Sequence, residues 1–158
     1  MGYTHYWYRD ESRMFTEDVI DFYAEFTRYA VQIIQTAEQQ GIELADPSGE
    51  HSGAWRVDGD SVRLNGYGED SHESFVWEKV CPQPQEWVKD KGYFDFCKTN
   101  RKPYDTVVTA LLLAVREAYG DAVRISSDGG FFDWKDGVRL FEEATGLVPT
   151  SSLDNVSA

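Results

Sequence analysis

The sequence has little cysteine, little positive charge and no long apolar run. Its two cysteines, Cys81 and Cys97, are too few among 158 residues for a disulfide scaffold or a cysteine-based zinc site. No apolar run reaches the roughly 18 residues of a membrane-spanning helix. The start, MGYTHYWYRD, lacks the basic and apolar regions of a secretion signal. We therefore expect a cytoplasmic protein with no membrane partner.

Acidic residues outnumber basic ones, with 28 Asp and Glu against 15 Lys and Arg and a formal net charge of -13. This balance argues against a general surface for DNA, RNA or anionic lipid. We expect no direct nucleic-acid binding, and any anionic partner must meet a locally basic site. The chain is 41% hydrophobic and has the length of one ordinary domain, so it can bury a core of its own.

Hydrophobic spacing predicts an α+β fold: a single globular domain over residues 1–149 with a flexible tail at 150–158. Apolar residues recur every three or four positions from about Thr16 to Gln40, which indicates a long N-terminal amphipathic helix. From residue 54 the period changes to two, typical of a hairpin over 55–57 and 62–64 and of a third strand over 73–80. An N-terminal strand is expected over 3–8.

The last third of the domain predicts a C-terminal βαβ unit with an extra helix. Its elements are a strand at 93–97, a helix at 104–119, a strand at 122–126 and a helix at 134–145. The helix at 104–119 has almost no polar face, so it should be the buried central helix. Together these elements predict a mixed, mainly antiparallel sheet.

The most informative segment for function is FDFCKTNRKPYD at 94–105, where Lys98, Arg101 and Lys102 occur without an acid between them. The segment should join the carboxyl end of a strand to the positive end of the buried helix, a junction that binds anions. Thr99 and Asn100 would add hydrogen bonds to a bound phosphate. The alternative is a solvated loop that balances nearby acids.

A second candidate is the loop GYGEDSHE at 66–73, which brings together Glu69, Asp70, His72 and Glu73. Carboxylates and an imidazole can hold a divalent metal or act as acid and base. The zinc-helix pattern His-Glu-x-x-His fails because Val76 stands at the second histidine position. A tight polar turn explains the segment equally well, and we expect neither a resident metal nor a cofactor.

The N-terminal strand is the third candidate. Alternation sends His5 and Trp7 to one face and Tyr6 to the other. Aromatic rings can stack on a base or a ribose, and His5 can donate a hydrogen bond. Tyr104, next to the basic segment, is a further candidate for stacking. The alternative is a core strand with a hydrogen-bonded histidine.

The motifs GYTHYW at 2–7, GEDSHE at 68–73, FDFCKTNRKPYD at 94–105 and SSDG at 126–129 together resemble a group of uncharacterised bacterial and phage proteins. The resemblance covers nearly the whole chain and implies a microbial or viral origin without a catalytic assignment. The chain is also similar in size to small acidic phage proteins that sequester nucleotide immune signals. That likeness implies an oligomer and an anionic ligand in a locally basic pocket.

Three functions follow as hypotheses. The first is a binding protein for a phosphate-bearing, nucleotide-like ligand, in which the basic segment binds phosphate and Glu69 or Asp70 accepts hydrogen bonds from sugar hydroxyls. It includes a phage protein that sequesters a host immune signal. The second is a hydrolase of a phosphorylated substrate, with His72 and Glu73 as its catalytic residues. The third is an acidic protein-interaction module.

Overall fold

The computed structural model of the chain describes residues 2–10, 18–81 and 92–149. Three predicted features lie outside these residues: the helix start at Thr16, the proline-containing segment at 82–90, and the tail at 150–158. The elements run in the order β1 (Thr4–Arg9), α1 (Asp18–Gln39), β2 (Leu44–Ala45), β3 (Arg56–Val57), β4 (Ser61–Gly66), β5 (Phe75–Glu78), β6 (Tyr93–Lys98), α2 (Asp105–Tyr119), β7 (Val123–Ser127) and α3 (Lys135–Thr145).

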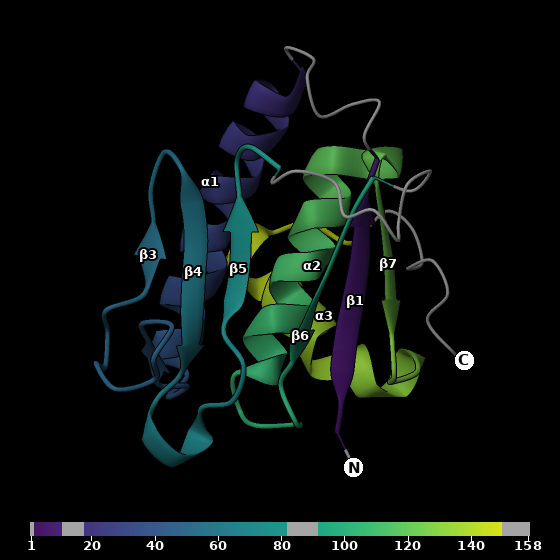
Figure 1. Ribbon diagram of the computed structural model, residues 1–158. Coiled ribbons are helices and arrows are strands. Elements are labelled where there is room, and N and C mark those ends of the chain that lie inside the picture. The colour runs from purple at the N-terminus through teal and green to yellow at the C-terminus, as the bar shows by residue number, and fades with distance from the viewer. Residues whose placement is uncertain (1, 11–17, 82–91, 150–158) are drawn as a thin grey trace.

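The strands form two antiparallel sheets with the three helices packed behind them in the view of Figure 1. One sheet has the order β6-β1-β7, and in the other β2, β3 and β5 all pair with β4. The predicted α+β class, the hairpin and the N-terminal helix are confirmed, and the domain is single and compact. The two-residue strand β2 was not predicted, because so short a run carries no periodicity.

The C-terminal βαβ unit is split. β6 and β7 both pair antiparallel with β1, so they run parallel to each other with β1 between them. Their carboxyl ends and the amino end of β1 therefore meet at one edge, shown at the bottom of Figure 1. This arrangement brings the N-terminal residues beside the basic segment that follows β6 and the loop that follows β7.

Helix α2 is the centre of the core, as predicted. Nearly every side chain from Val107 to Val115 is buried, because α1 and α3 pack on α2 while both sheets cover it. On α1 the inward stripe is Val19, Tyr23, Phe26, Ala30, Ile33, Ile34 and Ala37. Phe22 and Tyr29, which share the same spacing of three or four residues, are only partly buried at the margin of this stripe.

We expect Gly137→Ala to destabilise the protein, because α3 crosses α2 closely at this glycine. A Cβ at Gly137 would overlap Thr109, a buried residue of α2. Overpacking of this kind costs about 1–3 kcal/mol, measurable by urea unfolding. The matched control is Gly59→Ala, since no heavy atom lies within 4 Å of a Cβ there. Equal unfolding midpoints for the two variants would contradict the close packing.

Candidate ligand-binding site

Two loops, the basic segment after β6 and the loop after β7, lie on either side of the start of β1. The backbone N–H groups of Thr99 and Asn100 donate to the carbonyl of Tyr3 at 3.0 and 3.2 Å. On the other side, Asp128 N–H donates to the Thr4 carbonyl at 2.9 Å, and Thr4 N–H donates to the Asp128 carboxylate at 3.0 Å. The first residues of the chain therefore hold both loops in place.

The three cations of the basic segment do not converge. Arg101 and Lys102 line one pocket, whereas Lys98 lies on the outer face of the sheet against Gly2 and does not line that pocket. Arg101 stacks 3.9 Å from the centre of the Tyr3 ring and donates to the Asp133 carboxylate at 2.9 Å. The Lys102 ammonium has no carboxylate within 4.0 Å among the described residues.

The pocket has a volume of about 280 Å³ and opens between the loop that precedes α2 and the start of α3. Its apolar wall is Phe132, which is 81% exposed. The Arg101 hydrogen bond, with the backbone amide of Gly130, lowers the pKa of Asp133. The lining residues are Arg101, Lys102, Pro103, Asp105, Thr106, Thr109, Phe132, Asp133, Asp136 and Gly137.

The amides at the start of α2 are not free, contrary to the expected helix-end anion site. Asp105 N–H donates to the Lys102 carbonyl at 2.8 Å, and Val107 and Val108 donate to Tyr104 at 2.9 and 3.0 Å. The Asp105 carboxylate also lies in this first turn, where it complements the helix dipole. Any anion in the pocket must therefore be held by side chains.

The basic loop has an unusual backbone. Asn100 and Arg101 adopt φ values of 53° and 59°, and they are consecutive non-glycine residues in the left-handed region. Each costs about 1–2 kcal/mol. The loop turns Thr99 inward, where it is fully buried, and Asn100 and Arg101 outward.

Behind the pocket lies a buried chain of hydrogen bonds. His5 is fully buried; its Nε2 is 2.6 Å from Asp105 Oδ1 and its Nδ1 is 2.8 Å from Ser127 Oγ. The Thr99 hydroxyl donates to the same Asp105 oxygen at 2.5 Å. In the tautomer with the proton on Nε2, the ring donates to Asp105 and its Nδ1 accepts from the Ser127 hydroxyl.

This chain contains a serine, a histidine and an aspartate, but its surroundings do not suit acyl transfer. Stabilising an oxyanion requires backbone N–H groups that point at the reacting atom. Here Gly129 N–H donates to Ser127 Oγ itself at 3.0 Å, and Asp128 and Gly130 N–H donate to Thr4 and Asp133. We therefore interpret His5 as a positioning residue that ties β1 to α2 and β7.

The loop of the proposed hydrolase does meet the basic segment, through backbone contacts. The His72 Nδ1 atom lies 2.8 Å from the Lys98 carbonyl, and Glu73 accepts from Lys98 N–H at 2.9 Å. Glu69 and Asp70 are exposed in a 3-10 helix over Gly68–Asp70 and do not line the pocket. The described residues contain no group of three His, Cys, Asp or Glu that could hold a metal.

The residues predicted to stack on a ligand do not share one surface. Trp7 and Tyr104 are 1% and 0% exposed, and His5 is buried with them, so a ligand cannot reach these rings in this structure. Burial raises the pKa of Tyr104, and its hydroxyl donates to the Glu73 carbonyl at 2.5 Å. Tyr6 lies on the outer face, where its hydroxyl donates to Asp128 at 3.0 Å.

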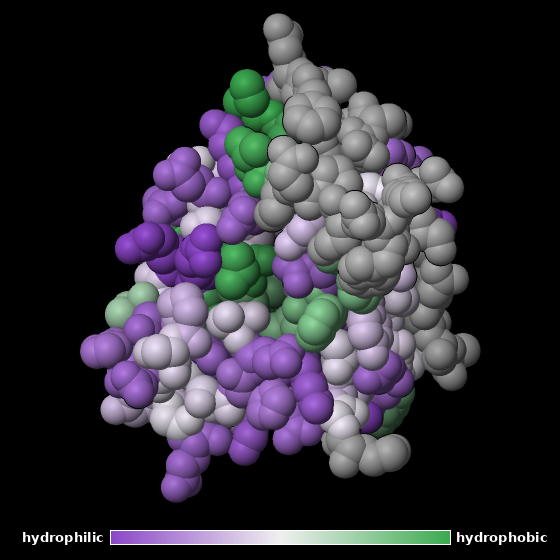
Figure 2. Space-filling model, viewed as in Figure 1, coloured by the Kyte–Doolittle hydropathy of each residue, from purple (hydrophilic) through white to green (hydrophobic). Residues whose placement is uncertain are grey.

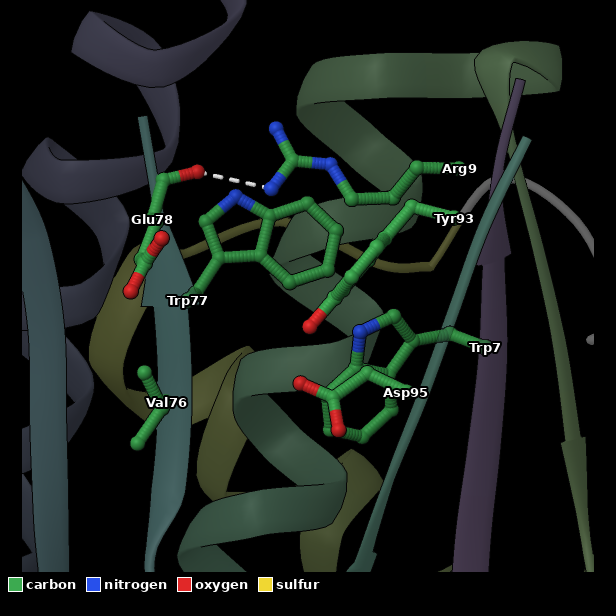
Figure 3. Close-up of a pocket in the computed structure, with 7 residues that line it drawn as sticks. All are labelled: Trp7, Arg9, Val76, Trp77, Glu78, Tyr93 and Asp95. Atoms are coloured by element: carbon green, nitrogen blue, oxygen red, sulfur yellow. Dashed lines mark hydrogen bonds between the residues drawn. The ribbon is translucent and has the colours of Figure 1, made fainter. Parts of the chain in front are cut away.

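A second cavity, shown in Figure 3, lies where the two sheets adjoin. Its volume of about 30 Å³ has room for roughly one water. Arg9, 2% exposed, donates to the carbonyls of Glu78 and Lys79 at 2.7 and 3.4 Å, and its guanidinium lies 4.3 Å from the centre of the Trp77 ring. No carboxylate among the described residues lies within 4.0 Å of it. Arg9 thus links β1 to the end of β5.

Comparisons of the chain with protein-family models, with curated proteins and with solved structures found no match. Among the described helices, none is long and apolar enough to cross a membrane.

Sequence reasoning found Arg101 and Lys102 but missed the opposite wall of the pocket. Phe132, Asp133 and Asp136 lie about 30 residues downstream of the basic segment, and only the packing of α3 on α2 brings them near it. The signal in the sequence was the pair Phe131-Phe132, which is exposed at 69% and 81%. Such exposed aromatic residues often mark a binding surface.

We expect His5→Ala to lower the free energy of unfolding by about 2–4 kcal/mol, because it removes the hydrogen bonds that His5 makes with Asp105 and Ser127 and opens a cavity. The matched control is His51→Ala, whose side chain is 69% exposed and pairs with Asp46 at the surface. The control should change stability by less than about 1 kcal/mol. Chemical unfolding of both variants tests the difference, and a small loss in both would show that His5 does not position this edge.

We expect Asp95→Asn to stabilise the protein at neutral pH. Burial beside the cavity in Figure 3 raises the pKa of Asp95. A carboxyl whose pKa is raised on folding opposes folding once it ionises, so its cost is absent below the usual pKa and grows as pH rises through the folded-state pKa. The gain should therefore be present at pH 7 and disappear near pH 3.

Asp58→Asn is the control, and its expected change in stability is opposite to that of Asp95→Asn. The backbone amides of Asp60 and Ser61 lower the pKa of Asp58. This variant should lose stability at pH 7, with the loss fading as the pH falls. Thermal unfolding between pH 3 and 7 measures both effects. A pH-independent difference for Asp95→Asn would contradict the burial argument.

Proposed function

We propose that the protein binds a small, phosphate-bearing, nucleotide-like molecule without chemical turnover, in the pocket lined by Arg101, Lys102 and Phe132. The observation that supports this most is Lys102. In a chain with 28 acids and 15 bases, its ammonium lines a pocket of about 280 Å³ without a carboxylate within 4.0 Å among the described residues. An ammonium in that setting suits a ligand oxyanion.

The charges around Lys102 restrict the ligand further. Of the three pocket carboxylates, Asp133 is paired with Arg101, and Asp105 is hydrogen-bonded by His5 and Thr99. Asp136 remains to accept hydrogen bonds from hydroxyl or amino groups of a ligand. Phe132 offers a face for a planar ring. One phosphate, nearby hydroxyls and a flat base fit this set better than a polyphosphate, which the carboxylates would repel.

This proposal replaces two groups of residues that the sequence predicted for ligand binding. Glu69 and Asp70, expected to contact a sugar, are replaced by Asp136, and Phe132 replaces the buried Trp7 and Tyr104 as the stacking ring. Sequestration of a host nucleotide signal by an oligomer follows from the resemblance to small phage proteins and is part of the same proposal. The hydrolase has less support, because His72 Nδ1 is engaged by the Lys98 backbone.

Calorimetric titration with nucleoside monophosphates, nucleoside triphosphates and inorganic phosphate tests the proposal. We expect Lys102→Ala to weaken monophosphate binding about 10- to 100-fold, since a hydrogen bond to a charged group contributes about 1.5–3 kcal/mol. Phe132→Ala should weaken nucleotide binding and leave phosphate binding unchanged. The matched control is Arg56→Ala, an exposed cation on β3 that does not line the pocket. Equal affinity in the native protein and Lys102→Ala would remove the pocket from the proposal.

A further inference from the structure

Asp133 lines the pocket, and both of its carboxylate oxygens are engaged. Oδ1 accepts from the Arg101 guanidinium and Oδ2 accepts from Gly130 N–H, each at 2.9 Å. The chain has 28 acidic against 15 basic residues, and polar residues surround a few separate apolar patches on the side shown in Figure 2, so a surface aspartate is ordinary in itself. Asp133 differs because it holds one of the two cations that line the pocket.

The Asp133 carboxylate is fixed by its own segment of chain. Asp133 belongs to a 3-10 helix over Phe131–Trp134, just before α3. Its backbone N–H donates to the Gly130 carbonyl at 3.0 Å, while its side chain accepts from Gly130 N–H. The Arg101 hydrogen bond, with that amide, lowers the pKa of Asp133, so the carboxylate is ionised at neutral pH. Asp133 therefore presents a fixed negative charge to Arg101.

Arg101 is held from a second side by Tyr3. Its guanidinium lies 3.9 Å from the centre of the Tyr3 ring, which is buried. The backbone that presents Arg101 is unusual, since Asn100 and Arg101 have consecutive φ values of 53° and 59°. Strained backbone of this kind persists only where the surrounding contacts maintain it. The Tyr3 ring and the Asp133 carboxylate are two such contacts, and they keep the Arg101 side chain paired.

We propose that Asp133 selects for a ligand with a single phosphate, because it neutralises Arg101 and leaves Lys102 alone to receive an oxyanion. The proposal rests on the proposed function of the pocket and names the residue that determines its specificity. Two cations and three carboxylates line the pocket, so each further phosphate meets uncompensated negative charge while Arg101 stays paired. A site can reject the wrong ligand by such an unfavourable element as well as by attraction to the right one.

Asp136 provides a comparison within the same pocket. It lines the pocket as Asp133 does, but among the described residues it forms no ion pair with either pocket cation. If only the total charge of the lining mattered, the two carboxylates would be equivalent. Repulsion by a carboxylate across an open pocket is screened by water and salt, whereas a hydrogen-bonded ion pair directly occupies the guanidinium. We therefore expect Asp133 to have the larger effect on phosphate number.

Calorimetric titration with AMP and ATP, in EDTA so that no metal neutralises the triphosphate, tests this difference. The readout is the ratio of the two dissociation constants. We expect Asp133→Asn to shift the ratio toward ATP about tenfold, the change that one added hydrogen bond to a charged group produces. Asp136→Asn, the matched control with the same loss of charge, should shift it less than about threefold. Equal shifts in the two variants would overturn the proposal.

Two further variants show whether Asp133 acts through Arg101. Arg101→Ala leaves the Asp133 charge unpaired, so it should shift the ratio toward AMP, and it keeps the proposal testable if Asp133→Asn is unstable. The double variant Asp133→Asn/Arg101→Ala should return the ratio to the native value within about threefold. A shift toward ATP that persists in the double variant would contradict the role of Arg101. Urea unfolding of each variant shows whether a change in binding reflects a change in fold.

Lys102→Ala separates this proposal from that of the pocket itself. If native protein binds AMP and Lys102→Ala loses that binding, the pocket is supported whatever the ratio does. An unchanged ratio in Asp133→Asn would then overturn the role of Asp133 alone. If native protein binds neither nucleotide, both proposals fail together.

Discussion

The hydrogen bond between His5 and Asp105 connects the parts of the molecule that form the Lys102 pocket. It joins the middle strand of one sheet to the first turn of the central helix, with Ser127 and Thr99 extending the chain to β7 and to the basic loop. All of these groups lie at or near the interior, where a lost partner costs about 1–3 kcal/mol. The loop that carries Arg101 and Lys102 is tied to this bond, because Thr99 donates to the same Asp105 oxygen while Asn100 and Arg101 turn outward.

Much of the fold could be read from the sequence because its strongest signals are local. The apolar run from Val107 to Val115 predicts a buried helix, and the Asp58-Gly59 turn predicts the hairpin of β3 and β4. The insertion of β1 between β6 and β7 joins residues about 90 to 120 positions apart, which no periodicity encodes. Strand alternation correctly separated Tyr6 from Trp7, but only the position of α2 decides which of the two is buried.

The basic segment shows that cations close together in the sequence need not lie in one site. Lys98, Arg101 and Lys102 are close in sequence, and a helical or extended backbone would have kept them in regular relation. Lys98 lies on the outer face of β6 by strand alternation, whereas the left-handed residues Asn100 and Arg101 turn the chain so that Arg101 and Lys102 line the pocket. Asn tolerates the left-handed region better than most residues, but Arg does not mark it, so the two-residue turn could not be predicted locally. The three cations of the segment therefore do not share one site.

Arg9 has a consequence for how the protein responds to acid. Ion pairs between strands weaken when their carboxylates become protonated, but the acceptors of Arg9 are the backbone carbonyls of Glu78 and Lys79, which do not titrate. Its other contact, the face of Trp77, is likewise insensitive to pH. The link that Arg9 makes between the two sheets therefore contains no group that acid can protonate, and it persists while carboxylates elsewhere lose their charge.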